Sequence, residues 1–346
     1  MLSKLQHQQT KSRISPRNRS QLRQGGNDSE LERTQNDKIS VVIPTYNDAK
    51  YLRLTLRSLL EQNRQPYEIV IIDDCPTDKK TKMMLEKNFQ SELKNRTIRY
   101  YKNQRNLGAG GARNRGVDLV HGDLVVFCDS DDIFLPHHLE AMFEARVKNN
   151  ADVVILNTKI FIDKDGQVIR QRKYKLRGSI EYKLFVLGLT GAYMLMRPEL
   201  AKELGGFRAD MVASRDKQMF AEDWEFSTRI FHAGYKIVMC DEGTYQRRKH
   251  SRSLTGSYLG WTKYRREVLF PRIATDPNFT RRQLAIFTYG TLVSAPMRQI
   301  PALFWQLLKL QPFFFIVQPA WVQLARISLG NRMRRRLNSV KIDRDE

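Results

Sequence analysis

The 346-residue chain is predicted to form a doubly wound α/β sheet, because short apolar runs alternate along it with helical patterns. The first run, residues 39–43, is β-branched and ends at Pro44, as a buried parallel strand does. A leucine-rich helical pattern over 51–60 separates it from a second run, 69–72, which ends on a pair of aspartates. This β-α-β order predicts ligand binding at the carboxyl ends of the strands.

The alternation continues beyond the second run. The pattern predicts helices over 79–89 and 110–120 and strands over 98–101, 124–127 and 152–157. A hairpin is expected over 159–175, since the turn residues Asp163 to Gly166 lie at its centre. No segment repeats at a fixed period, and we expect one main domain followed by a C-terminal extension.

Composition divides the chain into three parts. Residues 1–37 are rich in Gln, Ser, Arg and Asn and lack the apolar region of a signal peptide, so they are predicted to be a disordered tail. Residues 38–255 form the predicted main domain. Residues 256–346 are predicted to be a basic, aromatic-rich helical extension.

The charge balance points to anionic partners. The chain has 59 Lys and Arg against 37 Asp and Glu, a formal net charge of +22. Nucleic acid, anionic lipid and nucleotide phosphates are all compatible with this excess. From 246 to 346 there are 19 basic and 5 acidic residues, so the excess is mostly C-terminal.

The three cysteines are Cys75, Cys128 and Cys240. Their wide spacing does not match a metal site, and an odd number argues against a disulfide framework. We therefore expect a cytoplasmic protein.

Three carboxylates directly follow the predicted strand 124–127: Asp129, Asp131 and Asp132. Such a cluster is unfavourable without a cation, and Mg²⁺ or Mn²⁺ takes one or two carboxylates together with substrate phosphates. The cluster is therefore typical of a metal-diphosphate site. An Asp-rich turn that caps the next helix is an equally good interpretation of the segment alone.

Two further segments are candidates for binding a nucleotide. Asp74 ends the second strand, where a carboxylate can bind a base or ribose or can cap the following turn. Residues 106–116 are rich in glycine and contain Arg113, which suits close backbone approach and phosphate contact. A tight turn with solvated arginines explains the same residues.

An acidic pair, Glu222 and Asp223, opens a predicted amphipathic helix that runs through Phe231. Acidic residues in a first turn ordinarily complement the helix dipole. At a cleft, such a carboxylate can instead take the proton of an attacking hydroxyl.

These elements, in this order, resemble the family 2 glycosyltransferases, which have the GT-A fold. The resemblance covers about residues 39–255. The segments that carry it are 42–47, 72–74, 106–116, 129–132, Gly205-Gly206-Phe207 and Glu222-Asp223.

The resemblance implies an α/β fold of the GT-A type, a doubly wound mixed sheet with a nucleotide-sugar site at the strand C-terminal ends. Thr45, Tyr46 and Asp74 would bind the nucleoside, with Tyr46 packed on the base. Arg113 would lie near the base or phosphate, and Asp129 would face the ribose or donor sugar.

The resemblance also implies an inverting reaction that moves a sugar from a nucleotide diphosphate, a UDP-sugar, to the hydroxyl of a glycan, lipid or polysaccharide. Asp131 would bind Mg²⁺ or Mn²⁺, with Asp132 as a second contact, and His250 would contact the metal or diphosphate. Asp223 would be the catalytic base.

Two other functions use parts of the same pattern. A basic nucleic-acid-binding protein would use the charge and the aromatic residues, but it leaves the strand-end carboxylates unexplained, and no recognised nucleic-acid motif is present. A sugar nucleotidyltransferase shares the sheet and the metal, but its glycine-rich signature belongs at the first strand, where this chain has Pro44-Thr45-Tyr46.

The extension has its own pattern. Residues 284–329 are apolar and aromatic but contain four prolines, so a membrane-spanning helix is disfavoured. An arginine cluster at 332–336 follows. Aromatic residues flanked by basic ones suit a peripheral segment on an anionic membrane surface, and a helical subdomain that packs on the core is the alternative.

Overall fold

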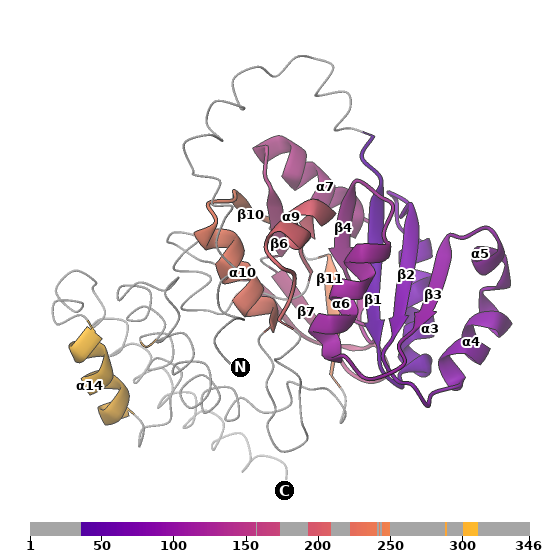
Figure 1. Cartoon of the computed structure of the whole chain (residues 1–346), viewed down its shortest axis with the longest axis horizontal. Helices are drawn as coiled ribbons and strands as arrows, with labels where there is room; N and C mark the ends of the chain where they lie inside the picture. The colour runs from indigo at the N-terminus through magenta and orange to yellow at the C-terminus, as the bar shows by residue number, and fades with distance from the viewer. Residues whose placement is uncertain are drawn as a thin grey trace, which may run out of the picture.

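Strands buried on both faces form the centre of the molecule. The computed structural model places β1 (Ile39–Thr45), β2 (Glu68–Asp73), β3 (Ile98–Lys102) and β4 (Leu124–Phe127) in parallel (Figure 1). Every residue of β2 and β4 is buried, which explains their continuous apolar runs. The structure describes residues 36–156, 158–173, 193–208, 222–240, 242, 244–249, 288 and 300–310.

Three more strands complete a seven-stranded mixed sheet. The short strand β9 (Leu195–Met196) lies antiparallel between β4 and β6 (Val153–Leu156), and β10 (Ile237–Cys240) pairs in parallel with β6. The strand order is β10-β6-β9-β4-β1-β2-β3. The predicted doubly wound mixed sheet is therefore confirmed.

Helices connect these strands and cover the sheet. Figure 1 shows α4 and α5 on the β3 side of the sheet and α10 on the β10 side. Gly116 lets α6 lie close to β1, because a Cβ atom there would overlap the side chain of Val42. The helices around the sheet are α3 (Ala49–Leu60), α4 (Lys80–Asn88), α5 (Gln90–Lys94), α6 (Gly108–Leu119), α7 (His138–Asn149), α9 (Pro198–Glu203) and α10 (Glu222–His232).

A second sheet of four strands has the order β5-β11-β7-β8. Its strands are β5 (Ile133–Phe134), β7 (Thr158–Ile162), β8 (Val168–Lys173) and β11 (Tyr245–Arg248). The predicted hairpin is confirmed, since β7 and β8 pair antiparallel and Gly166 has a φ of 93° in the turn. Pairing of β11 with β5 brings Tyr245 and its neighbours beside the acidic segment that follows β4.

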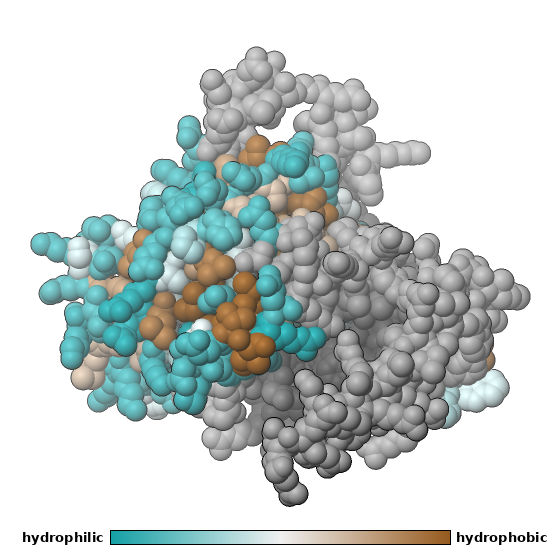
Figure 2. All heavy atoms as spheres, turned by 180° about the vertical axis from the view of Figure 1, so that it is seen from behind, coloured by the Kyte–Doolittle hydropathy of each residue, from teal (hydrophilic) through white to brown (hydrophobic). Residues whose placement is uncertain are grey.

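The surface agrees with a charged composition. Figure 2 shows that the described part of the rear face is mostly hydrophilic, with a hydrophobic area near its centre. Cys75, Cys128 and Cys240 are buried and are free thiols.

The predicted helical extension is described only in part. Helix α14 (Ile300–Leu310) lies in it; Leu307 has no exposed surface, whereas Trp305 is 64% exposed. Within the described ranges, no helix has both the length and the apolar character needed to cross a bilayer. Residues 1–35 of the predicted tail 1–37 and most of the extension lie outside the described residues. The domain boundaries stay predictions.

Candidate active site

The predicted nucleotide-binding residues meet at one edge of the central sheet. Thr45 ends β1, Asp74 follows β2 and Asp129 follows β4, and these three strands run in parallel. The backbone N–H of Asp74 donates to the carbonyl oxygen of Thr45 at 2.8 Å. The structure therefore gathers these residues at the carboxyl ends of neighbouring strands, where sheets of this kind bind ligands.

Thr45 and Tyr46 differ sharply in their exposure. The Thr45 side chain is buried, and its hydroxyl has no hydrogen-bond partner among the described residues. Tyr46 is 56% exposed, so its ring is accessible to a planar ligand. A buried hydroxyl without a partner is unfavourable. This pair therefore offers a hydrogen-bonding group and an aromatic face at the end of β1.

The carboxylate of Asp74 anchors the segment that leads into α6. It accepts hydrogen bonds from the side-chain amide of Asn103 at 2.6 Å and from the backbone N–H of Leu107 at 2.8 Å. Burial raises the pKa of Asp74 above its ordinary value, although both donors stabilise the charged form. The contact of Asp74 with a nucleoside stays a prediction. It would use carboxylate oxygens that already accept hydrogen bonds from Asn103 and Leu107.

Asp129 lies between a cation and a phenol. It accepts hydrogen bonds at 2.9 Å from Nη2 of Arg113 and at 2.9 Å from the hydroxyl of Tyr193. Burial alone would raise the pKa of Asp129, but the charges of Arg113 and Arg247 outweigh it and lower the pKa. Asp129 therefore stays ionised at the edge where a donor sugar is predicted to bind.

Asp132 points into the protein. It is 1% exposed and accepts hydrogen bonds from the Arg248 backbone N–H at 2.8 Å, from the Tyr193 hydroxyl at 3.0 Å and from the Tyr245 hydroxyl. Burial and the charges of Asp131 and Asp129 raise its pKa well above the ordinary value. Both carboxylate oxygens are thus held by protein donors, a geometry that does not favour the metal contact predicted for Asp132.

Asp131 is the more accessible carboxylate of this pair, since it is only partly buried. The described residues contain no group of three or more His, Cys, Asp or Glu side chains that could hold a metal by themselves. A single carboxylate suits Mg²⁺ when substrate phosphates supply further oxygens, so Asp131 fits such a shared site. His250 lies outside the described residues.

Arg113 is buried between two carboxylates, and its place near the base or phosphate of the donor stays a prediction. It is 4% exposed, and its Nη1 donates to Glu222 at 2.7 Å while its Nη2 donates to Asp129. The guanidinium also lies 5.5 Å from the ring centre of Phe207. Both ends of the guanidinium are occupied by protein carboxylates, so Arg113 joins the segment after β4 to the start of α10.

The predicted helix start at Glu222 and Asp223 is confirmed by α10. Glu222 is buried against Arg113, and burial raises its pKa even though the guanidinium lowers it. Asp223 is only partly buried, and one of its oxygens accepts from the Trp224 backbone N–H at 2.7 Å. Trp224 and Phe226 are buried against the core. Asp223 is thus the accessible member of the acidic pair.

The segment Gly205-Gly206-Phe207 follows α9 and is hydrogen-bonded to both α6 and α10. Asn114 on α6 accepts from the Phe207 backbone N–H and donates to the Phe207 carbonyl, each at 2.7 Å. Gly206 has a φ of 67°, and a Cβ atom there would overlap Asn114. Arg229 on α10 donates to the Gly206 carbonyl at 2.6 Å. The glycines of this motif therefore serve close packing within the protein.

Sequence reasoning missed several residues of this site. Tyr193, Tyr245 and the backbone of Arg248 hold the acidic segment, although they lie 61, 113 and 116 residues from Asp132. No local pattern marks a tyrosine for such a contact. No local pattern marks the contact of Glu222 either, since its partner Arg113 lies 109 residues away.

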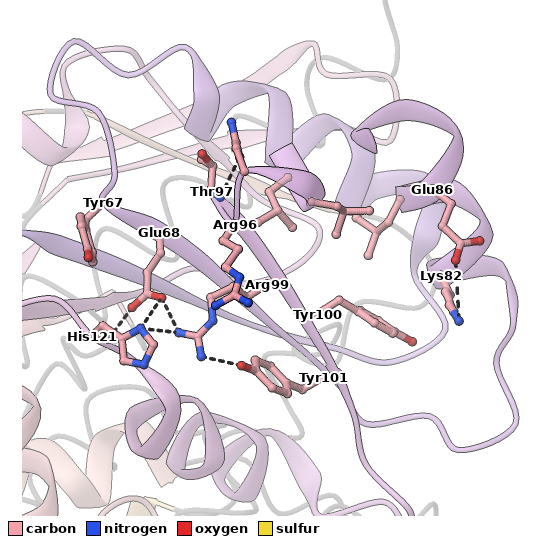
Figure 3. A pocket seen from close by; sticks show the side chains of 14 residues that line it. Tyr67, Glu68, Lys82, Glu86, Arg96, Thr97, Arg99, Tyr100, Tyr101 and His121 are labelled. Carbon is pink, nitrogen blue, oxygen red and sulfur yellow. Dashed lines mark hydrogen bonds and ion pairs between the residues drawn. The ribbon is translucent and has the colours of Figure 1, made fainter. Parts of the chain in front are cut away.

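A separate pocket of about 760 Å³ is bordered by β3, α4 and α5. Figure 3 shows Arg99 there between Glu68 and Tyr101, and it donates hydrogen bonds to both. None of the predicted site residues lines this pocket. The candidate active site is therefore the cluster at the strand ends.

The fold and the site together define a glycosyltransferase with the GT-A fold. Residues 40–205 match the family model of glycosyl transferase family 2. An uncharacterized glycosyltransferase of Methanocaldococcus jannaschii is 31% identical over 210 residues, which cover 59% of this chain and 68% of that protein. The chain belongs to glycosyl transferase family 2.

Two further comparisons extend over more of the chain. The amylovoran biosynthesis glycosyltransferase AmsB of Erwinia amylovora is 28% identical over 261 residues, which cover 72% of this chain and 81% of AmsB. S. aureus TarS in complex with UDP-GlcNAc matches the fold with a TM-score of 0.52 at 20% identity, covering 79% of this chain and 81% of that one. Family membership favours glycosyl transfer over the nucleotidyltransferase and nucleic-acid-binding alternatives.

Proposed function

We propose that the protein transfers a sugar from a UDP-sugar to an acceptor hydroxyl with inversion at the anomeric carbon. The observation that carries this proposal is that Arg113 donates both to Asp129 at the strand ends and to Glu222, the neighbour of the more accessible Asp223, at the start of α10. The complex of TarS with UDP-GlcNAc supports the donor class. The similarity to AmsB, a glycosyltransferase of amylovoran biosynthesis, supports a role in polysaccharide synthesis.

Each residue has a part in one displacement. Asp223 takes the proton of the acceptor hydroxyl while the oxygen of that hydroxyl forms a bond to the anomeric carbon. The bond from that carbon to the diphosphate oxygen breaks, and its electron pair leaves with the diphosphate. Asp131 would hold Mg²⁺ or Mn²⁺, which offsets the charge that develops on the diphosphate. Thr45 and Tyr46 would bind the nucleoside.

The direct test is the release of nucleoside diphosphate from a panel of nucleotide sugars with Mg²⁺ or Mn²⁺. We expect release from one or a few UDP-sugars, increased by a suitable acceptor. Failure of every UDP-sugar together with turnover of another nucleotide class would contradict the UDP assignment. Release of pyrophosphate from a sugar phosphate and a nucleoside triphosphate would instead show a sugar nucleotidyltransferase and would contradict glycosyl transfer.

We propose further that the extension binds an anionic membrane surface. Helix α14 supports this, because Trp305 is exposed beside the buried Leu307, so the helix has one covered and one open side. Exposed Trp is suited to the boundary between water and lipid. The basic residues of the extension would attract anionic headgroups.

Replacing Trp305 with Gln should weaken binding to anionic vesicles about tenfold, which corresponds to roughly 1.4 kcal/mol of lost apolar burial. Cosedimentation with phosphatidylserine vesicles measures the change, and phosphatidylcholine vesicles are the control for charge. The substitution spares Leu307, so the fold should persist. Equal binding by both proteins would favour an extension that packs on the core.

A further inference from the structure

The surroundings of Arg113 show what this residue can do. Its side chain is 5% exposed, and its two terminal nitrogens lie 2.7 Å from Glu222 and 2.9 Å from Asp129. The remaining nitrogen, Nε, has no hydrogen-bond partner among the described residues. A guanidinium whose terminal groups hold two carboxylates in different directions is a rigid spacer between them. It connects the strand-end site to the acidic helix start.

The geometry points to Arg113 as a positioning residue that sets the place of Asp223 by holding its neighbour Glu222. This inference rests on the proposed role of Asp223 as base. Glu222 and Asp223 are adjacent in the first turn of α10, so the contact that fixes one also fixes the helix rotation that presents the other. Arg113 thereby sets the separation of the base from Asp129 on the donor side.

The other hydrogen bonds described for α10 do not tie its first turn to α6. Arg229 holds the later part of the helix, since it donates to the Gly206 carbonyl at 2.6 Å and to Glu225 at 2.6 Å. Within the described ranges, Arg113 makes the side-chain hydrogen bond that ties Glu222 to α6. Without it, the acidic residues Asp129, Glu222 and Asp223 would repel one another across the site. The first turn of α10 would then shift or fray.

The consequence for catalysis is an effect on turnover and not on donor affinity. A displacement of a catalytic group by about 1 Å can cost roughly 10²-fold in rate. A residue that binds the base or phosphate of the donor has the opposite signature, because its loss raises the donor KM. This difference separates positioning by Arg113 from the nucleotide contact that the sequence predicts.

The test is a double-mutant cycle on the full-length protein with Arg113→Met, Glu222→Gln and the two together. We expect each single variant to lower kcat by about 10–100-fold, with the donor KM changed by less than about threefold. The double variant should be no worse than the singles, because the two residues act through one contact. Arg57→Met, which removes an exposed arginine on α3, is the control for loss of charge.

Three results would overturn the inference. Arg113→Met could raise the donor KM tenfold or more while Glu222→Gln has no effect, which assigns Arg113 to the donor. The two single effects could multiply in the double variant, which makes the roles independent. Glu222→Gln could leave kcat unchanged while Arg113→Met lowers it.

Arg113→Met removes the cation that Glu222 and Asp129 share and could fail to fold, so Arg113→Lys is the second variant. Lys keeps the charge but lacks the fork that spans both partners, so kcat should still fall with an unchanged donor KM. Unchanged kcat in Arg113→Lys would contradict positioning by the fork. If Asp223→Asn keeps full turnover, it is the base assignment that fails, independently of this cycle.

Discussion

Asp223→Asn should lower turnover by roughly 10²–10⁴-fold, the usual contribution of a positioned acid or base, while donor affinity is retained. Asn keeps the size of the side chain and can still accept from the Trp224 backbone N–H, but it cannot take the proton of the acceptor. The effect on the free energy of unfolding should be about 1 kcal/mol or less. Steady-state kinetics, donor binding by calorimetry and thermal melting measure the three quantities.

The control for Asp223→Asn is Asp118→Asn, which removes an exposed carboxylate on α6 and should be silent. Glu222→Gln is not a neutral control, since Glu222 holds Arg113. Loss of donor affinity in Asp223→Asn would place this residue in the nucleotide site. Unchanged turnover would remove it from the mechanism.

Asp131→Ala should reduce turnover to background and abolish the metal dependence of nucleotide binding, while the protein stays folded. A metal contributes several kcal/mol to the transition state, which corresponds to a loss of about 10³-fold or more. Calorimetric titration with UDP, with and without Mn²⁺, measures the binding effect, and circular dichroism checks the fold.

The matched variant is Asp132→Asn. Because Asp132 accepts from Arg248, Tyr193 and Tyr245 inside the protein, its substitution should change stability more than metal affinity. Full activity of Asp131→Ala, or of the wild-type protein in excess chelator, would contradict the metal role. An equal loss of metal affinity in both variants would restore Asp132 as a second ligand.

Much of the fold could be predicted from the sequence because its signals are local. The unbroken apolar runs of β1, β2 and β4 and the periodic apolar stripe of α3 can each be recognised from neighbouring residues alone. The two-residue strand β9 could not be predicted, since it is too short for a periodic signal and is defined by pairing with β4 and β6. Its placement is a tertiary effect.

The location of the candidate site at the strand ends could be predicted from the sequence, but the hydrogen-bond partners of its residues could not. Strand ends located Thr45, Asp74 and Asp129 correctly at one edge of the sheet, because parallel strands share a carboxyl edge. Glu222, a partner of Arg113, and the partners of Asp132, namely Tyr193, Tyr245 and Arg248, lie 61 to 116 positions away in the sequence. Contacts over such separations follow from packing, which spacing in the sequence does not encode.

The central claim, one displacement assisted by a single base, is tested most directly by the anomeric configuration of the product. Proton NMR of the initial product of transfer from an α-linked UDP-sugar should show a β-linkage, because the acceptor attacks from the face opposite the leaving diphosphate. Retention of the α-configuration would contradict the account. It would require a covalent intermediate or front-face attack, chemistry for which Asp223 as base is not sufficient.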